Sequence, residues 1–107
     1  MSVQARPFDV VVGRALGTVL VTVRGTLDQV TAREFSGCLD EVFGERPERV
    51  VIDLTGLDGL DTMGAAALRT AKRQADRDEV QVQLTSRNPG SLTALASAGL
   101  DQVFPVI

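Results

Sequence analysis

The sequence predicts a single α/β domain with a mixed β-sheet, an N-terminal antiparallel hairpin and helices packed against the sheet. Two apolar runs separated by a glycine-containing segment are typical of a hairpin. Strand-like and helix-like segments then alternate, and this pattern requires parallel strands joined by crossovers. The chain has 107 residues, 44% of them hydrophobic, which suits one domain with one core. The predicted order over residues 1–107 is β-β-α-β-α-β-α-β.

The hairpin is predicted from residues 8–12 and 18–24. Its glycine-containing loop, residues 13–17, supplies the left-handed backbone that a tight turn requires. In the second run, valines alternate with more polar residues, which is the pattern of a strand with one face better buried. Gly25 is expected to end this strand.

The first helix is expected to begin at Thr31, because Thr31 and Glu34 have the spacing of a capping box. Gly44 and then Pro47 end it. Cys38 lies on its apolar stripe, so we expect a small core residue there rather than a redox sensor. A lone cysteine excludes an internal disulfide. The other members of this stripe are Phe35, Leu39, Val42 and Phe43.

The middle of the chain predicts a core strand over residues 49–54, a turn over residues 55–60 and a helix over residues 62–77. The strand is apolar on both sides, as expected for a position inside a sheet. The helix is rich in alanine and presents a small apolar face, which favours close packing on the sheet. That face comprises Gly64, Ala67, Leu68, Ala71 and Ala75, and the opposite, solvated side carries Arg69, Lys72, Arg73 and Arg77.

The last third of the chain predicts a strand over residues 80–85, a helix and a short closing strand. Asn88 and Pro89 are the cap and first-turn proline of the helix, and Gly99 ends it. Its inward face is expected to carry Leu92, Leu95 and Ala96. Residues 103–104 predict the closing strand, which Pro105 confines to an edge of the sheet.

Composition excludes several function classes. A net charge of -3 argues against nucleic acid, since binding to phosphate backbones relies on clustered lysine and arginine. The chain has no histidine and one cysteine, which leaves no metal site, no cofactor and no catalytic triad to expect. There is also no apolar run of the length that a signal peptide or membrane span needs. We therefore expect a cytoplasmic protein that is not an enzyme and does not insert into a membrane.

The segment Asp61-Thr62-Met63-Gly64 is the strongest candidate site. It combines a hydroxyl group with the start of a helix, where backbone N–H groups lack internal partners and the dipole favours an anion. Thr62 is therefore a candidate phosphoacceptor. The alternative is that Thr62 only caps the helix, its oxygen accepting a bond from an N–H group of the first turn.

Four segments in order resemble the successive motifs of STAS domains, above all the stand-alone anti-sigma factor antagonists. They are residues 25–28 (GTLD), 51–54 (VIDL), 60–64 (LDTMG) and 98–104 (AGLDQVF). The resemblance implies a small switch protein that binds an anti-sigma factor kinase and so frees a sigma factor. The kinase, which supplies ATP and Mg²⁺, would phosphorylate the residue after the aspartate of the DSxG motif, here Thr62, and a phosphatase would reverse the reaction. The usual acceptor is serine, and the extra methyl group of threonine is expected to slow the transfer.

The resemblance also implies a partner-binding surface around the acceptor, to which Asp28, Asp61, Met63 and Gly64 would contribute, on a monomer or weak dimer. Three of these residues also have a simpler interpretation. Asp28 can end a strand or cap a helix, Asp61 can be a charge at a helix start, and Gly64 can serve close packing. Two other functions stay open, a non-phosphorylated STAS subunit of a lipid-transport ABC complex and a sensor of a small ligand or nucleotide.

A phosphate on Thr62 is expected to act by local repulsion. It adds a charge of about -1.5 to -2 and would face an acidic rim, so that a docked partner is released without refolding. The rim is predicted to comprise Asp28, Asp53, Asp58 and Asp61. Asp53 has a simpler interpretation as a turn acceptor for backbone N–H groups.

Overall fold

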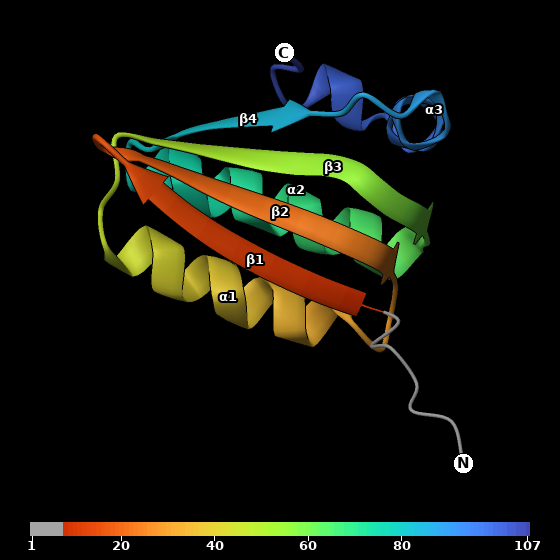
Figure 1. Cartoon of the computed structure of the whole chain (residues 1–107), viewed down its shortest axis with the longest axis horizontal. Coiled ribbons are helices and arrows are strands. Elements are labelled where there is room, and N and C mark those ends of the chain that lie inside the picture. The colour runs from red at the N-terminus through yellow and green to blue at the C-terminus, as the bar shows by residue number, and fades with distance from the viewer. Residues whose placement is uncertain (1–7) are drawn as a thin grey trace.

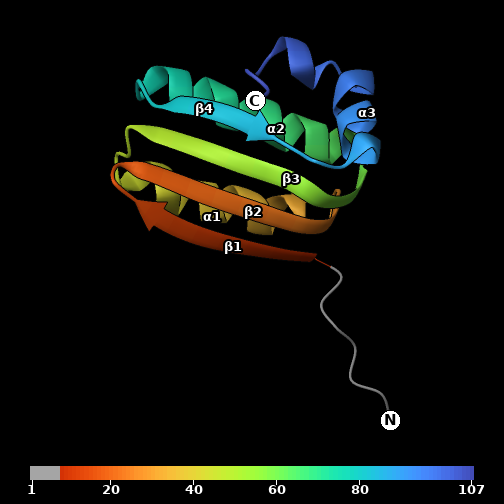
Figure 2. The ribbon, with the colours of Figure 1, turned by 45° about the horizontal axis from the view of Figure 1, so that its top comes forward.

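A four-stranded sheet with the strand order β1-β2-β3-β4 forms the centre of the structure, a computed structural model that describes residues 8–107. β1 is antiparallel to β2, whereas β2, β3 and β4 are parallel neighbours, so the mixed sheet is confirmed. Figures 1 and 2 show α1 and α2 on one face of the sheet, and α3 near the carboxyl ends of β3 and β4. The elements are β1 (Phe8–Ala15), β2 (Thr18–Leu27), α1 (Ala32–Gly44), β3 (Arg49–Leu60), α2 (Thr62–Arg77), β4 (Gln81–Thr85) and α3 (Pro89–Ser97), followed by a 3-10 turn (Leu100–Gln102).

The core lies between the sheet and the layer formed by α1 and α2. Alternate residues of each strand point into it, and α1 adds the apolar stripe predicted from its sequence, except for Cys38. Cys38 is only half-buried, and its burial raises the pKa of the thiol, so the reactive thiolate is disfavoured. The largest fully buried side chains include Val21, Leu27, Phe35, Leu39, Ile52, Leu54, Leu68 and Leu84.

The hairpin between β1 and β2 is tighter than predicted. β1 continues to Ala15, which pairs with Thr18, so the turn consists of Leu16 and Gly17 alone. Both have positive φ angles, 52° and 81°, as a two-residue hairpin turn of the I′ type requires. The glycine-based prediction of a loop over residues 13–17 was wrong because only Gly17 of its two glycines takes a left-handed conformation.

The predicted ends of β2 and β3 were also wrong. β2 continues through Gly25 to Leu27, and β3 continues to Leu60 where a turn was expected. Two register shifts in this pairing, each with an extra residue on β3, mark β-bulges that let the glycine-containing strands stay paired. Gly25 has a φ of 97°, so it bends β2 rather than ending it. The long β3 carries the chain directly to the start of α2.

The helices lie where the sequence predicts them, but one cap and some of the residues that face the core differ from the prediction. α2 spans the predicted residues, although Ala65 replaces Ala67 among its buried positions. Thr31 precedes α1, but the side-chain bond of the predicted capping box is not formed. The Asn88 side chain caps α3 as predicted, accepting a bond from the Gly90 N–H at 2.9 Å. On α3, Ser91 and Leu95 are buried, whereas Leu92 and Ala96 are exposed, in contrast to the expected inward face.

The closing strand predicted at residues 103–104 does not form. These residues follow the 3-10 turn, and pairing with β4 is limited to one bridge between Leu84 and Val106. There the Leu84 N–H donates to the Pro105 carbonyl and the Ile107 N–H donates to the Leu84 carbonyl, both at 2.9 Å. The chain end therefore covers only the last part of the β4 edge.

Candidate functional site

Thr62 is the first residue of α2, and its side chain is exposed. The residue that caps the helix is Asp61, whose Oδ1 accepts a bond from the Gly64 N–H at 2.8 Å. The alternative in which Thr62 serves as the cap is therefore excluded. Within residues 8–107, no hydrogen bond involves the hydroxyl group of this exposed residue.

Asp61 also joins α2 to the turn between β2 and α1. Its second oxygen, Oδ2, accepts a bond from the Gln29 N–H at 3.2 Å, and its own N–H donates to the Leu27 carbonyl at 3.2 Å. A carboxylate is suited to this position because it has two oxygens that can each accept. Asp61 thus fixes the start of α2 against the 28–31 turn, and its negative charge lies at the positive end of the helix dipole.

Asp28 organises that turn. Its Oδ1 accepts bonds from the Val30 N–H at 2.9 Å and the Thr31 N–H at 3.0 Å, while the Thr31 hydroxyl accepts a bond from the Asp28 N–H and donates to the Thr26 carbonyl. These bonds use the Thr31 side chain outside α1, which explains why this side chain does not make its bond of the predicted capping box. Asp28 directly follows the end of β2 and holds the turn, as one simpler interpretation has it, whereas Thr31 rather than Asp28 stands at the cap position of α1. The half-exposed side chain of Asp28 still reaches the surface.

The hydrogen bonds to Asp28 predict a pH dependence. The Thr31 N–H, and then the Val30 N–H and the Thr31 hydroxyl, hold the pKa of the Asp28 carboxyl below its usual value. A lowered pKa means that this contribution to stability is present above about pH 3.9 and is lost as the pH falls through the folded-state pKa. In Asp28→Asn, the free energy of unfolding should therefore depend less steeply on pH below about pH 4. Denaturant unfolding at several pH values, together with an NMR titration of the carboxyl carbon, checks this, and a normal Asp28 pKa would contradict it.

Two exposed apolar side chains flank these acids. Met63, predicted as a partner-binding residue, is 51% exposed, and Val30 is 84% exposed. Val30 was not predicted as a site residue, although a valine inside the polar segment 28–31 is an available signal. The Gln29–Asp61 hydrogen bond holds the turn that carries Val30 against the start of α2, which carries Met63. Apolar residues beside charged ones are the composition of a protein-binding patch.

Gly64 is buried and lies against β2. A Cβ atom at this position would be 2.1 Å from the Leu27 carbonyl oxygen and 2.7 Å from its carbon, both backbone atoms. Only glycine permits this approach, which supports the close-packing interpretation. Any contribution of Gly64 to a partner-binding surface is thus indirect, through the position it allows for Thr62 and Met63.

The acidic rim is smaller than predicted. Because β3 continues to Leu60, Asp53 lies in mid-strand, roughly 26 Å along the chain from Asp61 at about 3.3 Å per residue. Its Oδ1 accepts bonds from the Thr55 N–H at 2.9 Å and the Thr55 hydroxyl at 2.7 Å, so the turn-like interpretation of its side chain is supported. Asp58 is exposed and close to Asp61 along the chain. The Gln29–Asp61 bond brings Asp28 and Asp61 together, and the rim is now expected to comprise these two residues and Asp58.

A groove of about 400 Å³ lies between the start of α2 and α3. Thr62 and Arg69 both line it, with Ala65, Ala94 and Ala98 among its apolar residues. The predicted solvated position of Arg69 was wrong, because this half-buried side chain crosses to α3 and its Nη2 donates to the Ala98 carbonyl oxygen. The candidate acceptor thus has a long cationic side chain on its own face of the helix.

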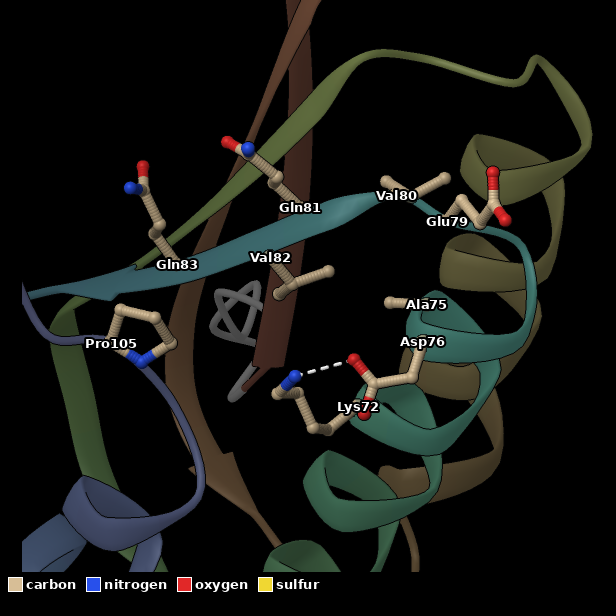
Figure 3. A pocket seen from close by; sticks show the side chains of 9 residues that line it. All are labelled: Lys72, Ala75, Asp76, Glu79, Val80, Gln81, Val82, Gln83 and Pro105. Atoms are coloured by element: carbon tan, nitrogen blue, oxygen red, sulfur yellow. Dashed lines mark hydrogen bonds and ion pairs between the residues drawn. The ribbon is translucent and has the colours of Figure 1, made fainter.

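A larger hollow, of about 560 Å³, lies at the edge of β4. Figure 3 shows Val82 and Ala75 facing it, with Lys72 bonded to Asp76 at 2.5 Å, while Gln81 and Gln83 project from the other side of the strand. It shares no lining residue with the groove beside Thr62. Small-molecule binding there would therefore be separate from chemistry at Thr62.

Comparison with known proteins identifies the family. The family model for the STAS domain matches residues 10–107, which is nearly the whole chain. The chain belongs to the STAS domain family. The family resemblance of the four sequence motifs is thus confirmed, and the single α/β domain with its mixed sheet agrees with the STAS fold. No curated protein matches this STAS domain in sequence.

Several solved structures resemble this chain. An anti-sigma factor antagonist from Mycobacterium paratuberculosis is 25% identical, with a TM-score of 0.83 over 97% of this chain and 89% of that one. The anti-sigma factor antagonist SpoIIAA in its unphosphorylated form is 13% identical, with a TM-score of 0.75 over 92% and 88%. A sulfate transporter family protein from Wolinella succinogenes is 20% identical, with a TM-score of 0.75 over 86% and 77%. The last two likenesses show the fold alone.

Among the helices of residues 8–107, none combines the length and the apolar character that crossing a bilayer requires. The first seven residues, on which the prediction of no signal peptide partly rests, lie outside the described part of the chain.

Proposed function

We propose that this STAS domain is an anti-sigma factor antagonist, which binds an anti-sigma factor kinase and is switched off by phosphorylation at Thr62. The observation that carries the proposal is that the Thr62 hydroxyl group makes no hydrogen bond within residues 8–107, because Asp61 and not Thr62 caps α2. The similarity to the Mycobacterium paratuberculosis antagonist supports the class of partner. In the dephosphorylated state the protein would hold the kinase and free the sigma factor for transcription.

The chemistry needs no catalytic group from this chain. The Thr62 oxygen attacks the γ-phosphorus of ATP, held with Mg²⁺ by the kinase, and forms a P–O bond as the bond to the leaving ADP breaks. A base on the kinase takes the hydroxyl proton. What the STAS domain contributes is an exposed acceptor on a rigid helix start, so that the reacting oxygen is already positioned. A separate phosphatase would return the hydroxyl form by hydrolysis.

The acceptor assignment predicts the result of a mass measurement. Incubation with an anti-sigma factor kinase of the same organism, ATP and Mg²⁺ should add one phosphoryl group to the intact mass, and Thr62→Ala should abolish the gain. Thr62→Ser should be phosphorylated faster, because serine lacks the methyl group that restricts χ1. Thr70→Ala, an exposed threonine two turns along α2, is the matched control and should behave as the unmodified sequence does.

Two results would overturn the proposal. One is an unchanged mass with a kinase that phosphorylates another substrate in the same assay. The other is a mass gain that persists in Thr62→Ala. Stable co-purification with a transport ATPase, without any phosphate, would support the transport-subunit alternative instead.

A further inference from the structure

Thr62 and Arg69 lie on the same face of α2. They are seven residues apart, which is two helical turns and about 10 Å of rise. The Cα–Cβ bonds of a helix are tilted toward its N-terminus, so the Arg69 side chain starts in the direction of Thr62. Both residues line the groove between α2 and α3, and the floor between them includes Ala65. No bulky side chain of the groove separates the two along the helix.

Arg69 is held by a neutral partner. Its Nη2 donates to the Ala98 carbonyl oxygen at the end of α3, a contact that is partly buried. Within residues 8–107 the guanidinium makes no ion pair, and the only carboxylate that lines the groove is that of Asp61. Asp61 is engaged by the N–H groups of Gly64 and Gln29. An arginine bonded to a carbonyl gains if an anion comes within reach, because a guanidinium can form two parallel N–H···O bonds with a phosphate and the opposite charges attract.

We infer that Arg69 is the phosphate-binding residue of the switch: on phosphorylation of Thr62 its guanidinium leaves the Ala98 carbonyl and pairs with the phosphate. The inference rests on the proposed phosphorylation of Thr62. The cation that holds the phosphate then belongs to this chain. The hydrogen bond between Arg69 on α2 and Ala98 at the end of α3 is then present only in the unphosphorylated protein. The phosphate then lies over the groove, and the Ala98 carbonyl is released.

The phosphate itself provides the first test. Phosphothreonine is placed at position 62 of the full chain by genetic-code expansion, and its second ionisation is followed by ³¹P NMR. That pKa is about 6 for an unpaired phosphate. A paired arginine favours the dianion, so the pKa should be lower in the Arg69 protein than in Arg69→Gln by about half a pH unit or more. Arg69→Lys should recover part of the shift, and Arg73→Gln, an exposed arginine one turn further along, should leave it unchanged.

The Gly99 amide provides the second test, since it belongs to the same peptide group as the Ala98 carbonyl. Its ¹⁵N–¹H resonance should move on phosphorylation when Arg69 is present and stay in place in Arg69→Gln. Equal phosphate pKa values in the Arg69 and Arg69→Gln proteins, or an unmoved Gly99 resonance, would overturn the inference. Because no kinase is used, these results are independent of whether a kinase modifies Thr62. A failed mass experiment therefore counts against the proposed function alone.

Discussion

Gly64→Ala is expected to lower the free energy of unfolding by about 2 kcal/mol, within the usual cost of overpacking. The added methyl group would meet the Leu27 carbonyl at 2.1 Å, and a backbone carbonyl inside a paired strand cannot move away as a flexible side chain can. The start of α2 must shift instead, which weakens the Asp61 cap and its bond to Gln29. Urea unfolding followed by far-UV circular dichroism measures the loss.

Gly37→Ala is the matched control for this prediction. Gly37 lies inside α1, is exposed, and a Cβ atom there would have no neighbour within 4 Å. Alanine is favoured over glycine inside a helix by about 1 kcal/mol, so this substitution should stabilise the protein. The same chemical change is thus expected to have opposite signs at the two positions. A Gly64→Ala protein as stable as Gly37→Ala would show that α2 is not held by this contact.

The helices could be predicted from sequence better than the ends of the strands. α2 and the Asn88 cap follow from local signals, namely alanine content, an acidic residue before the helix and a proline at its first turn. A glycine after an apolar run predicts a turn, but in β2 and β3 the glycines lie at bulges. A Cβ at Gly56 would approach the Arg24 side chain to 2.9 Å, and one at Gly59 would approach the Thr26 side chain to 3.3 Å. Whether glycine ends a strand or lets it pass a neighbour depends on pairing that local sequence does not contain.

Part of the candidate site could likewise be predicted from the sequence, and part could not. An exposed Thr62 beside a helix start could be predicted, because it depends on neighbouring residues only. The bond from Gln29 to Asp61 joins residues 32 apart in the chain, and the bond from Arg69 to Ala98 joins residues 29 apart. The first makes Val30 part of the surface and the second places a cation in the groove. Neither follows from periodicity, since both depend on how β2, α2 and α3 meet in space.

The phosphorylated protein is expected to bind its anti-sigma factor kinase at least ten-fold more weakly than the unmodified protein. A ten-fold change corresponds to about 1.4 kcal/mol, which is less than the usual cost of placing like charges together at an interface. Even when paired with one arginine, the phosphate adds negative charge beside Asp28, Asp58 and Asp61. Calorimetry or surface plasmon resonance on the two forms measures the difference.

Salt separates repulsion from steric bulk as the cause of this release. The screening length falls from about 8 Å at physiological ionic strength to about 3 Å at 1 M salt. If repulsion dominates, the ratio of the two dissociation constants should fall as salt is raised, and Asp58→Asn, which removes an exposed charge of the rim, should lower that ratio at low salt. If the ratio of the dissociation constants changes neither with salt nor in Asp58→Asn, the steric bulk of the phosphate causes the release. Equal binding of the phosphorylated and unmodified proteins would contradict the switch. Repulsion at the rim needs no refolding, because backbone N–H groups already hold the carboxylates of Asp28 and Asp61 in place.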